Sequence, residues 1–332
     1  MNSVLERLNA GHHLALEDER VVFLGEDILD PYGGAFKVSR GLSTRYPERV
    51  LTTPISEAAI VGLANGLALR GLRPIVEIMF GDFVTLIADQ LINQAAKFRW
   101  MYNDQVRVPL VVRAPMGGRR GYGPTHSQSL EKIFLGIPGL KTVAPNTLVD
   151  PAELLVSAVK DDDPVLFVEH KLLYTRPMLL PGLGELLDFE VSQTEGPYPA
   201  CSLRSPVKPA GLTIATYGYN FELARAAALD LMMEHELFVE LVVFTQLSPF
   251  HLDPLLESLS RTGRLLTVEE GGRTMGWGAE VLARCSERNP SLPATRVAAL
   301  DLPIANARSL EEATLPGQAD IVKAAMRLAG IA

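Results

Sequence analysis

Short apolar runs alternate with longer helical segments in the first half of the chain. The runs have the length and β-branched content of buried strands, and they lie at residues 21–24, 75–80, 108–113, 141–143 and 164–168. Between them, residues 57–70 and 82–101 have the pattern of helices. A further helix is predicted from Asp150, which can cap it, with Pro151 at its first position and Glu153 at its third. This alternation predicts an α/β fold with a mostly parallel sheet covered by helices on both faces.

The alternation stops at a proline-rich segment and then resumes. Six prolines fall between residues 174 and 209, so we expect a linker over residues 176–210. Beyond it, the pattern predicts strands at residues 212–216, 238–244 and 265–268, and helices at residues 221–236 and 276–288. The sequence therefore predicts two domains, residues 1–175 and 211–332, each with a mostly parallel sheet flanked by helices.

Composition narrows the class of protein. The chain has 332 residues, 47% of them hydrophobic, which is enough for two domain cores. Its net charge of -8 argues against a nucleic-acid partner. Cys201 and Cys285 form neither a disulfide framework nor a metal site, which favours a reducing compartment. The first residues lack the pattern of a signal peptide, and no apolar run reaches membrane-spanning length. We therefore expect a soluble cytoplasmic protein with no membrane partner.

Glu57 is the first candidate for chemistry. It lies where a strand-like segment gives way to an uncharged run, residues 60–69, which contains Gly62 and Gly66. Burial raises the pKa of a carboxyl group, so Glu57 could exchange protons near neutral pH. The alternative is a structural helix start, in which Ser56 caps the helix and Glu57 complements its dipole.

The helix that begins at Glu57 is apolar on all sides. A helix of this kind is expected to be buried all round. Gly62 and Gly66 would allow another backbone to approach closely. The sequence leaves open whether the helix is buried inside its own domain or across a subunit interface.

Three further segments carry candidate groups whose local signal is ambiguous. Residues 77–83 include Met79 and Phe83, which could line a pocket for a flat ring or belong to the core. Residues 116–123 form a glycine-rich loop that leads to His126, and we expect this loop to be flexible. Asp161, Asp162 and Asp163 are adjacent, which is a poor arrangement for Ca²⁺ or Mg²⁺, and the alternative is a solvated acidic turn.

Several common motifs are absent from the sequence. It contains no P-loop, no dinucleotide-binding glycine fingerprint after the first strand, and no His or Cys cluster with zinc spacing. These absences exclude the nucleotide and zinc sites that sequence motifs can reveal.

Four segments, taken in order, carry a resemblance to a known family. They are residues 24–37, which include Gly25-Glu26-Asp27, and residues 52–59, 77–83 and 122–129. Together they resemble the β subunit of thiamine-diphosphate-dependent 2-oxo acid dehydrogenases, such as the pyruvate, branched-chain and acetoin dehydrogenases, in the transketolase superfamily. The resemblance is dense over residues 21–170 and looser after Thr213. It implies a pyrimidine-binding domain followed by a transketolase-like C-terminal domain.

The resemblance implies roles for individual residues. Glu57 matches the carboxyl group that drives the imino tautomer of the aminopyrimidine. Phe83 matches the residue that stacks on this ring, and Met79 matches one that lines the same pocket. His126 matches the active-site histidine that stabilises intermediates or shuttles protons during acyl transfer. A structural potassium ion is implied at a turn whose counterparts here are Leu110, Ala158, Val159, Asp161 and Asp163.

The resemblance also implies partners. The family binds magnesium and the diphosphate through a Gly-Asp-Gly segment with a downstream Asn, and this chain lacks that segment. It therefore implies a separate α subunit that holds magnesium and shares thiamine diphosphate in an α2β2 heterotetramer. The implied reaction is decarboxylation of a 2-oxo acid and acyl transfer to a lipoyl group on an acyltransferase core.

Two other functions stay open at this point. One is a thiamine-dependent acyl or ketol transferase of a specialised pathway that uses another acceptor. The chain departs from the family at residues 243–249 and 269–274, which leaves the acceptor undefined. The other is a non-catalytic scaffold subunit, but a scaffold has no need to keep Glu57, Phe83 and His126 together.

Overall fold

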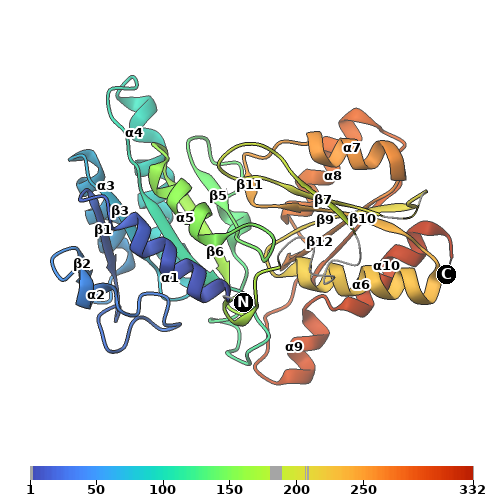
Figure 1. Ribbon diagram of the computed structural model, residues 1–332, viewed down its shortest axis with the longest axis horizontal. Helices are drawn as coiled ribbons and strands as arrows, with labels where there is room; N and C mark the ends of the chain where they lie inside the picture. The colour runs from blue at the N-terminus through green and yellow to red at the C-terminus, as the bar shows by residue number, and fades with distance from the viewer. Residues whose placement is uncertain (1–2, 180–188, 206, 208, 332) are drawn as a thin grey trace. The chain divides into compact units, whose positions relative to one another are not determined.

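The computed structural model describes residues 3–179, 189–205, 207 and 209–331, and these fold into two units (Figure 1). Unit 1 contains the described residues up to 117 and residues 133–178. Unit 2 contains residues 118–132 and the described residues from 179 onward. The second unit therefore includes a short segment, residues 118–132, that the sequence pattern placed in the first domain.

Unit 1 is built on a parallel sheet with the strand order β5-β6-β4-β3-β1-β2. Its strands are β1 (Val21–Gly25), β2 (Val50–Thr52), β3 (Arg73–Glu77), β4 (Val111–Met116), β5 (Lys141–Val143) and β6 (Val165–His170). Every residue of β1, β4 and β6 is buried, as expected for a parallel sheet covered on both faces. Because the strands are parallel, all their carboxyl ends meet at one edge of the sheet.

Helices cover this sheet. They are α1 (Val4–Ala15), α2 (Leu42–Arg45), α3 (Glu57–Leu69), α4 (Ala96–Met101) and α5 (Pro151–Lys160), with the 3-10 and π segments η1 (Gly81–Ile87), η2 (Gln90–Ala95) and η4 (Leu173–Thr175). A further 3-10 turn, η3 (Glu131–Phe134), lies where the chain passes from unit 2 back to unit 1. The start of α5 is confirmed, because the Asp150 side chain accepts a hydrogen bond from the Ala152 N–H and Pro151 follows it.

The single helix predicted over residues 82–101 is wrong. This stretch divides into a 3-10 helix (η1), a π-helix (η2) and the short α4. One cause is Asn65, whose side-chain amide donates to the Gln90 carbonyl at 2.9 Å. Gly81 also packs directly on Met116, whose Cγ would lie 2.2 Å from any Cβ added there. These contacts come from other elements, so the local pattern could not predict them.

Helix α3 is not buried all round within the single chain. Leu63 and Leu69 are 54% and 40% exposed, and Gly66 has open space where a Cβ would lie. Ala59 is exposed on the same face, at helical spacing from Leu63. The alternative of complete burial inside the domain is therefore wrong, and an apolar face with Ala59, Leu63, Gly66 and Leu69 remains uncovered.

Unit 2 has a sheet with the order β13-β12-β9-β10-β8-β7. Its strands are β7 (Glu190–Gln193), β8 (Cys201–Arg204), β9 (Leu212–Tyr217), β10 (Val239–Phe244), β12 (Leu265–Gly272) and β13 (Ala294–Ala299), and β11 (Gln246–Ser248) follows β10 in the chain. The four strands β13, β12, β9 and β10 are parallel, whereas β8 and β7 join antiparallel. Residues 176–210, where a linker was expected, thus contain two strands of this sheet.

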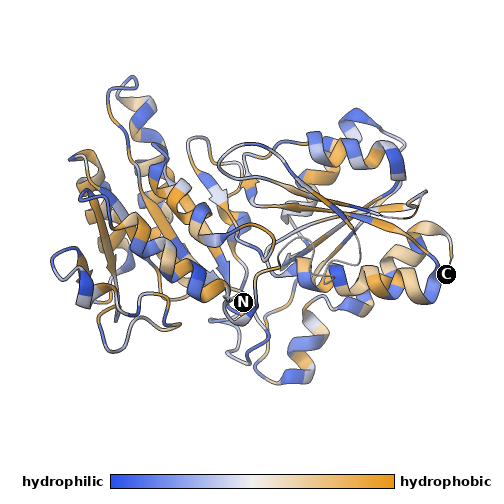
Figure 2. Ribbon diagram, viewed as in Figure 1, coloured by the Kyte–Doolittle hydropathy of each residue, from blue (hydrophilic) through white to orange (hydrophobic). Residues whose placement is uncertain are grey.

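The helices of unit 2 are α6 (Asn220–His235), α7 (Asp253–Thr262), α8 (Trp277–Arg288), α9 (Arg308–Thr314) and α10 (Gln318–Ala329). Hydrophobic residues are concentrated along the strands of both units, while the helices carry hydrophilic residues as well (Figure 2). Within the ranges that the structure describes, every helix is too short or too polar to cross a membrane.

Candidate active site

Glu57 lies at the first position of α3 and is only 7% exposed. Ser56 precedes it with φ −166° and ψ 81°, and its side chain makes no capping hydrogen bond. The alternative in which Ser56 caps the helix is therefore wrong. What remains is a buried carboxyl group at the N-terminus of α3.

Glu26 is the neighbour of Glu57. It follows β1 directly, and β1 pairs with β2, which precedes Glu57. Burial, and then the charge of Glu57, raise the pKa of Glu26, while the backbone N–H of Ser56 partly lowers it. The Glu26 Oε1 atom is buried and has no hydrogen-bond partner among the described residues. The structure thus pairs two buried carboxyl groups, an arrangement that suits proton exchange.

The aromatic candidates lie beside this pair of acids in the fold. Met79 and Phe80 follow β3, and Phe83 lies in η1, which packs against α3. The Phe80 and Phe83 rings meet edge to face, with centroids 6.1 Å apart. Met79 and Phe83 are half-buried, so each keeps accessible surface that a flat heterocycle could cover.

A buried ionic cluster supports the carboxyl ends of β3, β4 and β6. Arg113 donates to Glu77 at 2.6 Å and to both oxygens of Glu169 at 2.7 Å. The Tyr174 hydroxyl donates to Glu169 at 2.5 Å. Burial raises the pKa of Glu77, although Arg113 opposes the shift. Gly34 lies directly against Glu77, since an added Cβ would lie 2.8 Å from its Oε1 atom.

His126 belongs to unit 2. It is half-buried, its Nδ1 atom lies 3.0 Å from the Thr125 hydroxyl, and its backbone N–H donates to the Gly123 carbonyl at 3.3 Å. Arg119, in the loop before His126, donates to the Glu270 carboxylate and to the Pro316 carbonyl. The expected flexible loop is therefore held to unit 2 by specific hydrogen bonds.

Unit 2 also contains buried acids that the sequence did not single out. Glu131 accepts a hydrogen bond from the Tyr217 hydroxyl at 2.6 Å. Burial raises the pKa of Glu269 to about 7, although the Gly278 N–H at the start of α8 donates to it and lowers the pKa. No local pattern marks these acids, because their burial depends on the packing of segments that are distant in the chain.

The five counterparts of the potassium ligands are Leu110, Ala158, Val159, Asp161 and Asp163. Arg73 donates to the Val159 and Asp161 carbonyls at 2.8 and 3.0 Å. Lys141 donates to both Asp161 carboxylate oxygens at 2.7 Å. Two cationic side chains therefore already neutralise this turn, which is not the solvated acidic turn of the alternative. Across the described residues, no cluster of three or more His, Cys, Asp or Glu side chains could hold a metal ion.

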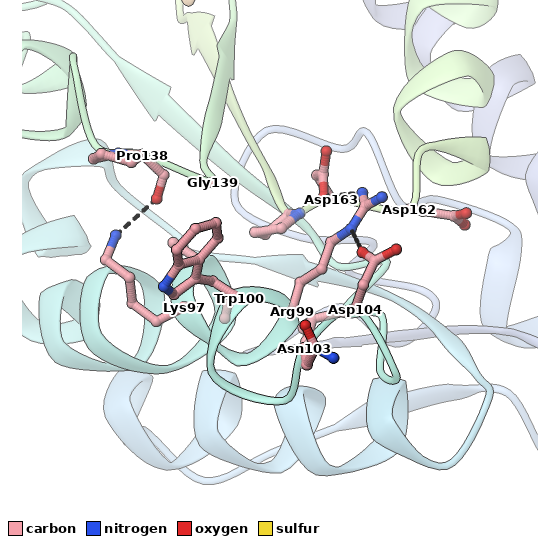
Figure 3. Close-up of a pocket in the computed structure, with 13 residues that line it drawn as sticks. Lys97, Arg99, Trp100, Asn103, Asp104, Pro138, Gly139, Asp162 and Asp163 are labelled. Carbon is pink, nitrogen blue, oxygen red and sulfur yellow. Dashed lines mark hydrogen bonds and ion pairs between the residues drawn. The ribbon is translucent and has the colours of Figure 1, made fainter.

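A cavity of about 850 Å³ lies elsewhere in unit 1, beside α4 (Figure 3). Of the predicted site residues, only Asp163 lines it. Its charged rim is paired within the chain, because Arg99 donates to Asp104 and Asp163 and Lys97 donates to the Pro138 carbonyl. This cavity is therefore separate from the carboxyl pair at Glu57.

The two α/β units, with a buried acid at the start of α3, define a protein of the transketolase class. Residues 8–177 match the family model of the transketolase pyrimidine-binding domain, and residues 207–321 match that of the transketolase C-terminal domain. The chain belongs to this family, in the group that contains the β subunits of 2-oxo acid dehydrogenases.

Relatives match over nearly the whole chain. The chain is 33% identical over 317 residues to a pyruvate dehydrogenase E1 component subunit beta from Rickettsia bellii, covering 94% of each chain. It is 36% identical to an acetoin:2,6-dichlorophenolindophenol oxidoreductase subunit beta from Cupriavidus necator, covering 93% of this chain and 92% of the relative. It is also 36% identical to a 2-oxoisovalerate dehydrogenase subunit beta from Pseudomonas aeruginosa, covering 98% and 94%.

A solved structure supports the fold. A split-gene transketolase, an inactive β4 tetramer, matches with a TM-score of 0.76, covering 100% of this chain and 99% of its own. Its sequence identity is 19%, so the similarity concerns the fold alone.

Proposed function

We propose that this chain is the β subunit of a thiamine-diphosphate-dependent 2-oxo acid dehydrogenase. Together with an α subunit it decarboxylates a 2-oxo acid and passes the acyl group to a lipoyl acceptor. The observation that carries the proposal is the buried Glu57 at the start of α3, next to Glu26 and to the element that holds Phe83. The names of the relatives favour this function over a different transferase or a scaffold.

The described residues fit the pyrimidine half of thiamine diphosphate. When bound, the cofactor supplies the nucleophilic carbon that adds to the 2-oxo acid. Glu57 would hold a proton at the pyrimidine ring nitrogen, and burial would keep that hydrogen bond strong. Phe83 would present its ring face to the heterocycle, and Met79 would line the same pocket with a polarisable thioether.

In this proposal, the partner subunit binds the diphosphate half of the cofactor. The chain has no Gly-Asp-Gly segment for magnesium and the diphosphate, so we assign both to an α subunit. The uncovered apolar face of α3, with Leu63 and Gly66, is the kind of surface that a second subunit would bury. We accordingly propose an α2β2 heterotetramer in the cytoplasm that serves a lipoyl acyltransferase core. We also propose a potassium ion at the turn of Asp161 and Asp163. The Val159 and Asp161 carbonyl oxygens each accept one hydrogen bond from Arg73, and each keeps a second lone pair that could bind the ion.

The assembled protein tests the function. The chain, purified together with an α subunit that carries the Gly-Asp-Gly segment, is expected to release CO₂ from a 2-oxo acid only when thiamine diphosphate and magnesium are present. Failure to release CO₂ from pyruvate and from branched-chain 2-oxo acids alike would contradict the proposal.

The isolated chain is expected to bind thiamine diphosphate weakly or not at all. The reason is that the diphosphate and its metal find no ligands on this chain. Calorimetric titration of the isolated chain with the cofactor and magnesium measures this directly, with the α-containing assembly as the control. Micromolar binding by a monomer or homodimer would overturn the two-subunit proposal.

His126→Ala is expected to impair acyl transfer more than decarboxylation. Turnover with the lipoyl acceptor should fall by at least roughly tenfold, equivalent to about 1.4 kcal/mol of barrier, while cofactor binding changes little. Decarboxylation measured with an artificial electron acceptor should be less affected. An equal loss in both assays would place His126 in the decarboxylation step, and no loss in either would remove it from the mechanism.

A further inference from the structure

The loop of residues 118–132 is fastened to unit 2 at its start by two carboxylates. The Gly118 N–H donates to Glu270 Oε1 at 2.7 Å, and the Arg119 guanidinium donates to Glu270 Oε2 at 3.2 Å. The Arg119 N–H donates to Glu311 Oε1 at 2.7 Å, and the Gly121 N–H donates to Glu311 Oε2 at 3.2 Å. Glu270 and Glu311 are only 3% exposed each, so both acids are committed to the loop rather than to solvent.

These carboxylates hold a backbone that would not adopt this shape by itself. Arg119 has φ +68°, in the left-handed region that side-chain-bearing residues rarely occupy. Gly118 is packed so closely that an added Cβ would lie 2.5 Å from Leu315 Cδ1. Hydrogen bonds from backbone N–H groups to an ionised carboxylate are among the stronger ones in proteins, so they can offset this strain.

The far end of the loop is fastened as well. Glu131 is buried and accepts from the Tyr217 hydroxyl at 2.6 Å, and Lys132 donates to the Thr274 carbonyl at 2.8 Å. His126 lies between the two fastened ends, in a turn closed by its own N–H and the Gly123 carbonyl. The position of the imidazole therefore depends on how firmly both ends are held.

We propose that Glu311, assisted by Glu270, is a positioning residue that fixes the loop and through it His126. Neither acid needs to touch the substrate, because each acts through the backbone of residues 118–121. This inference rests on the role proposed for His126. It adds α9, an element far along the chain, to the parts of the protein on which acyl transfer depends.

Glu311→Gln in the α-containing assembly tests whether the Glu311 carboxylate holds the backbone of residues 118–121. Glutamine keeps one acceptor oxygen but turns an NH₂ group toward the second backbone donor, so one of the two N–H groups loses its partner. Glu312→Gln is the matched control, because Glu312 is the next residue of α9, is exposed and pairs with the exposed Arg308. Melting curves of both variants establish that the assembly folds.

Hydrogen exchange of the loop is the first measurement, because it does not depend on activity. The amides of residues 118–121 are expected to exchange at least roughly tenfold faster in Glu311→Gln, and unchanged in Glu312→Gln. Unchanged exchange in Glu311→Gln would contradict the proposal that Glu311 holds the loop, whatever the activity of the variant. If Glu311→Gln fails to fold, Glu270→Gln loosens the same loop from β12 and is judged by the same measurement.

Kinetics then test the connection to His126. In Glu311→Gln, kcat with the lipoyl acceptor is expected to fall about three- to tenfold, as expected for the loss of one such hydrogen bond, while the KM for the 2-oxo acid is unchanged. The double variant His126→Ala/Glu311→Gln is expected to be no slower than His126→Ala. The reason is that Glu311 acts only through His126, so its loss has no further effect once the imidazole is gone. Faster exchange with unchanged kcat, or an additive loss in the double variant, would overturn the positioning role. If His126→Ala keeps full activity, the proposed catalytic role of His126 is refuted. The exchange result would still show whether Glu311 holds the loop.

Discussion

Glu57→Gln is expected to reduce decarboxylation by roughly 10²–10⁴-fold while the subunits still assemble. Glutamine has the size of glutamate and can form a hydrogen bond, but it cannot exchange the proton that sets the tautomer of the pyrimidine. Glu57 is 7% exposed, so water has little room to replace the lost carboxyl group. The chemical step should therefore lose most of its rate, and the fold should lose little.

The measurement is CO₂ release under single turnover by the assembled enzyme. Ser56→Ala is the matched control, because Ser56 is adjacent and its side chain does not cap α3. It should retain activity and stability. A Glu57→Gln variant within a factor of about three of wild type would return Glu57 to a purely structural role at the helix start.

Several strand positions and helix starts followed from the sequence, where local chemistry decides them. β5 lies at the residues predicted, and α5 starts at the predicted Asp150 cap. The helix of residues 82–101 was wrong because the Asn65 side chain donates to the Gln90 carbonyl from another element. The exposed face of α3 was missed for a different reason. Its apolar pattern reports burial, but it does not say whether the same chain provides that burial.

The candidate site likewise combines residues that the sequence marks with residues that only the fold brings together. Glu57 stood out in the local pattern, and the resemblance to a family supplied the roles proposed for Glu57, Met79, Phe83 and His126. Glu26 became a partner of Glu57 only when the pairing of β1 with β2 brought their carboxyl ends together. Glu311 contacts Arg119 across 192 positions of sequence, so no local pattern could connect α9 with the loop of His126.

Arg113→Leu is expected to destabilise unit 1 by about 3–5 kcal/mol, because it leaves two buried carboxyl groups without their counter-charge. Arg113 is 1% exposed and pairs with Glu77 and Glu169, which are also buried. Arg99→Leu is the control, since Arg99 is a more exposed arginine that also pairs with two acids, Asp104 and Asp163. The loss in the control should be about 0–1 kcal/mol.

The dependence on pH gives this prediction its sharpest test. Burial already raises the pKa of Glu77, and removal of Arg113 should raise it further. A carboxyl group whose pKa is higher in the folded state contributes stability that is present at low pH and is lost as pH rises through that pKa. Denaturant unfolding of Arg113→Leu should therefore approach wild type near pH 5 and depart from it toward pH 8. A deficit of the same size at both ends of this range would mean that lost packing, rather than unpaired charge, destabilises the variant.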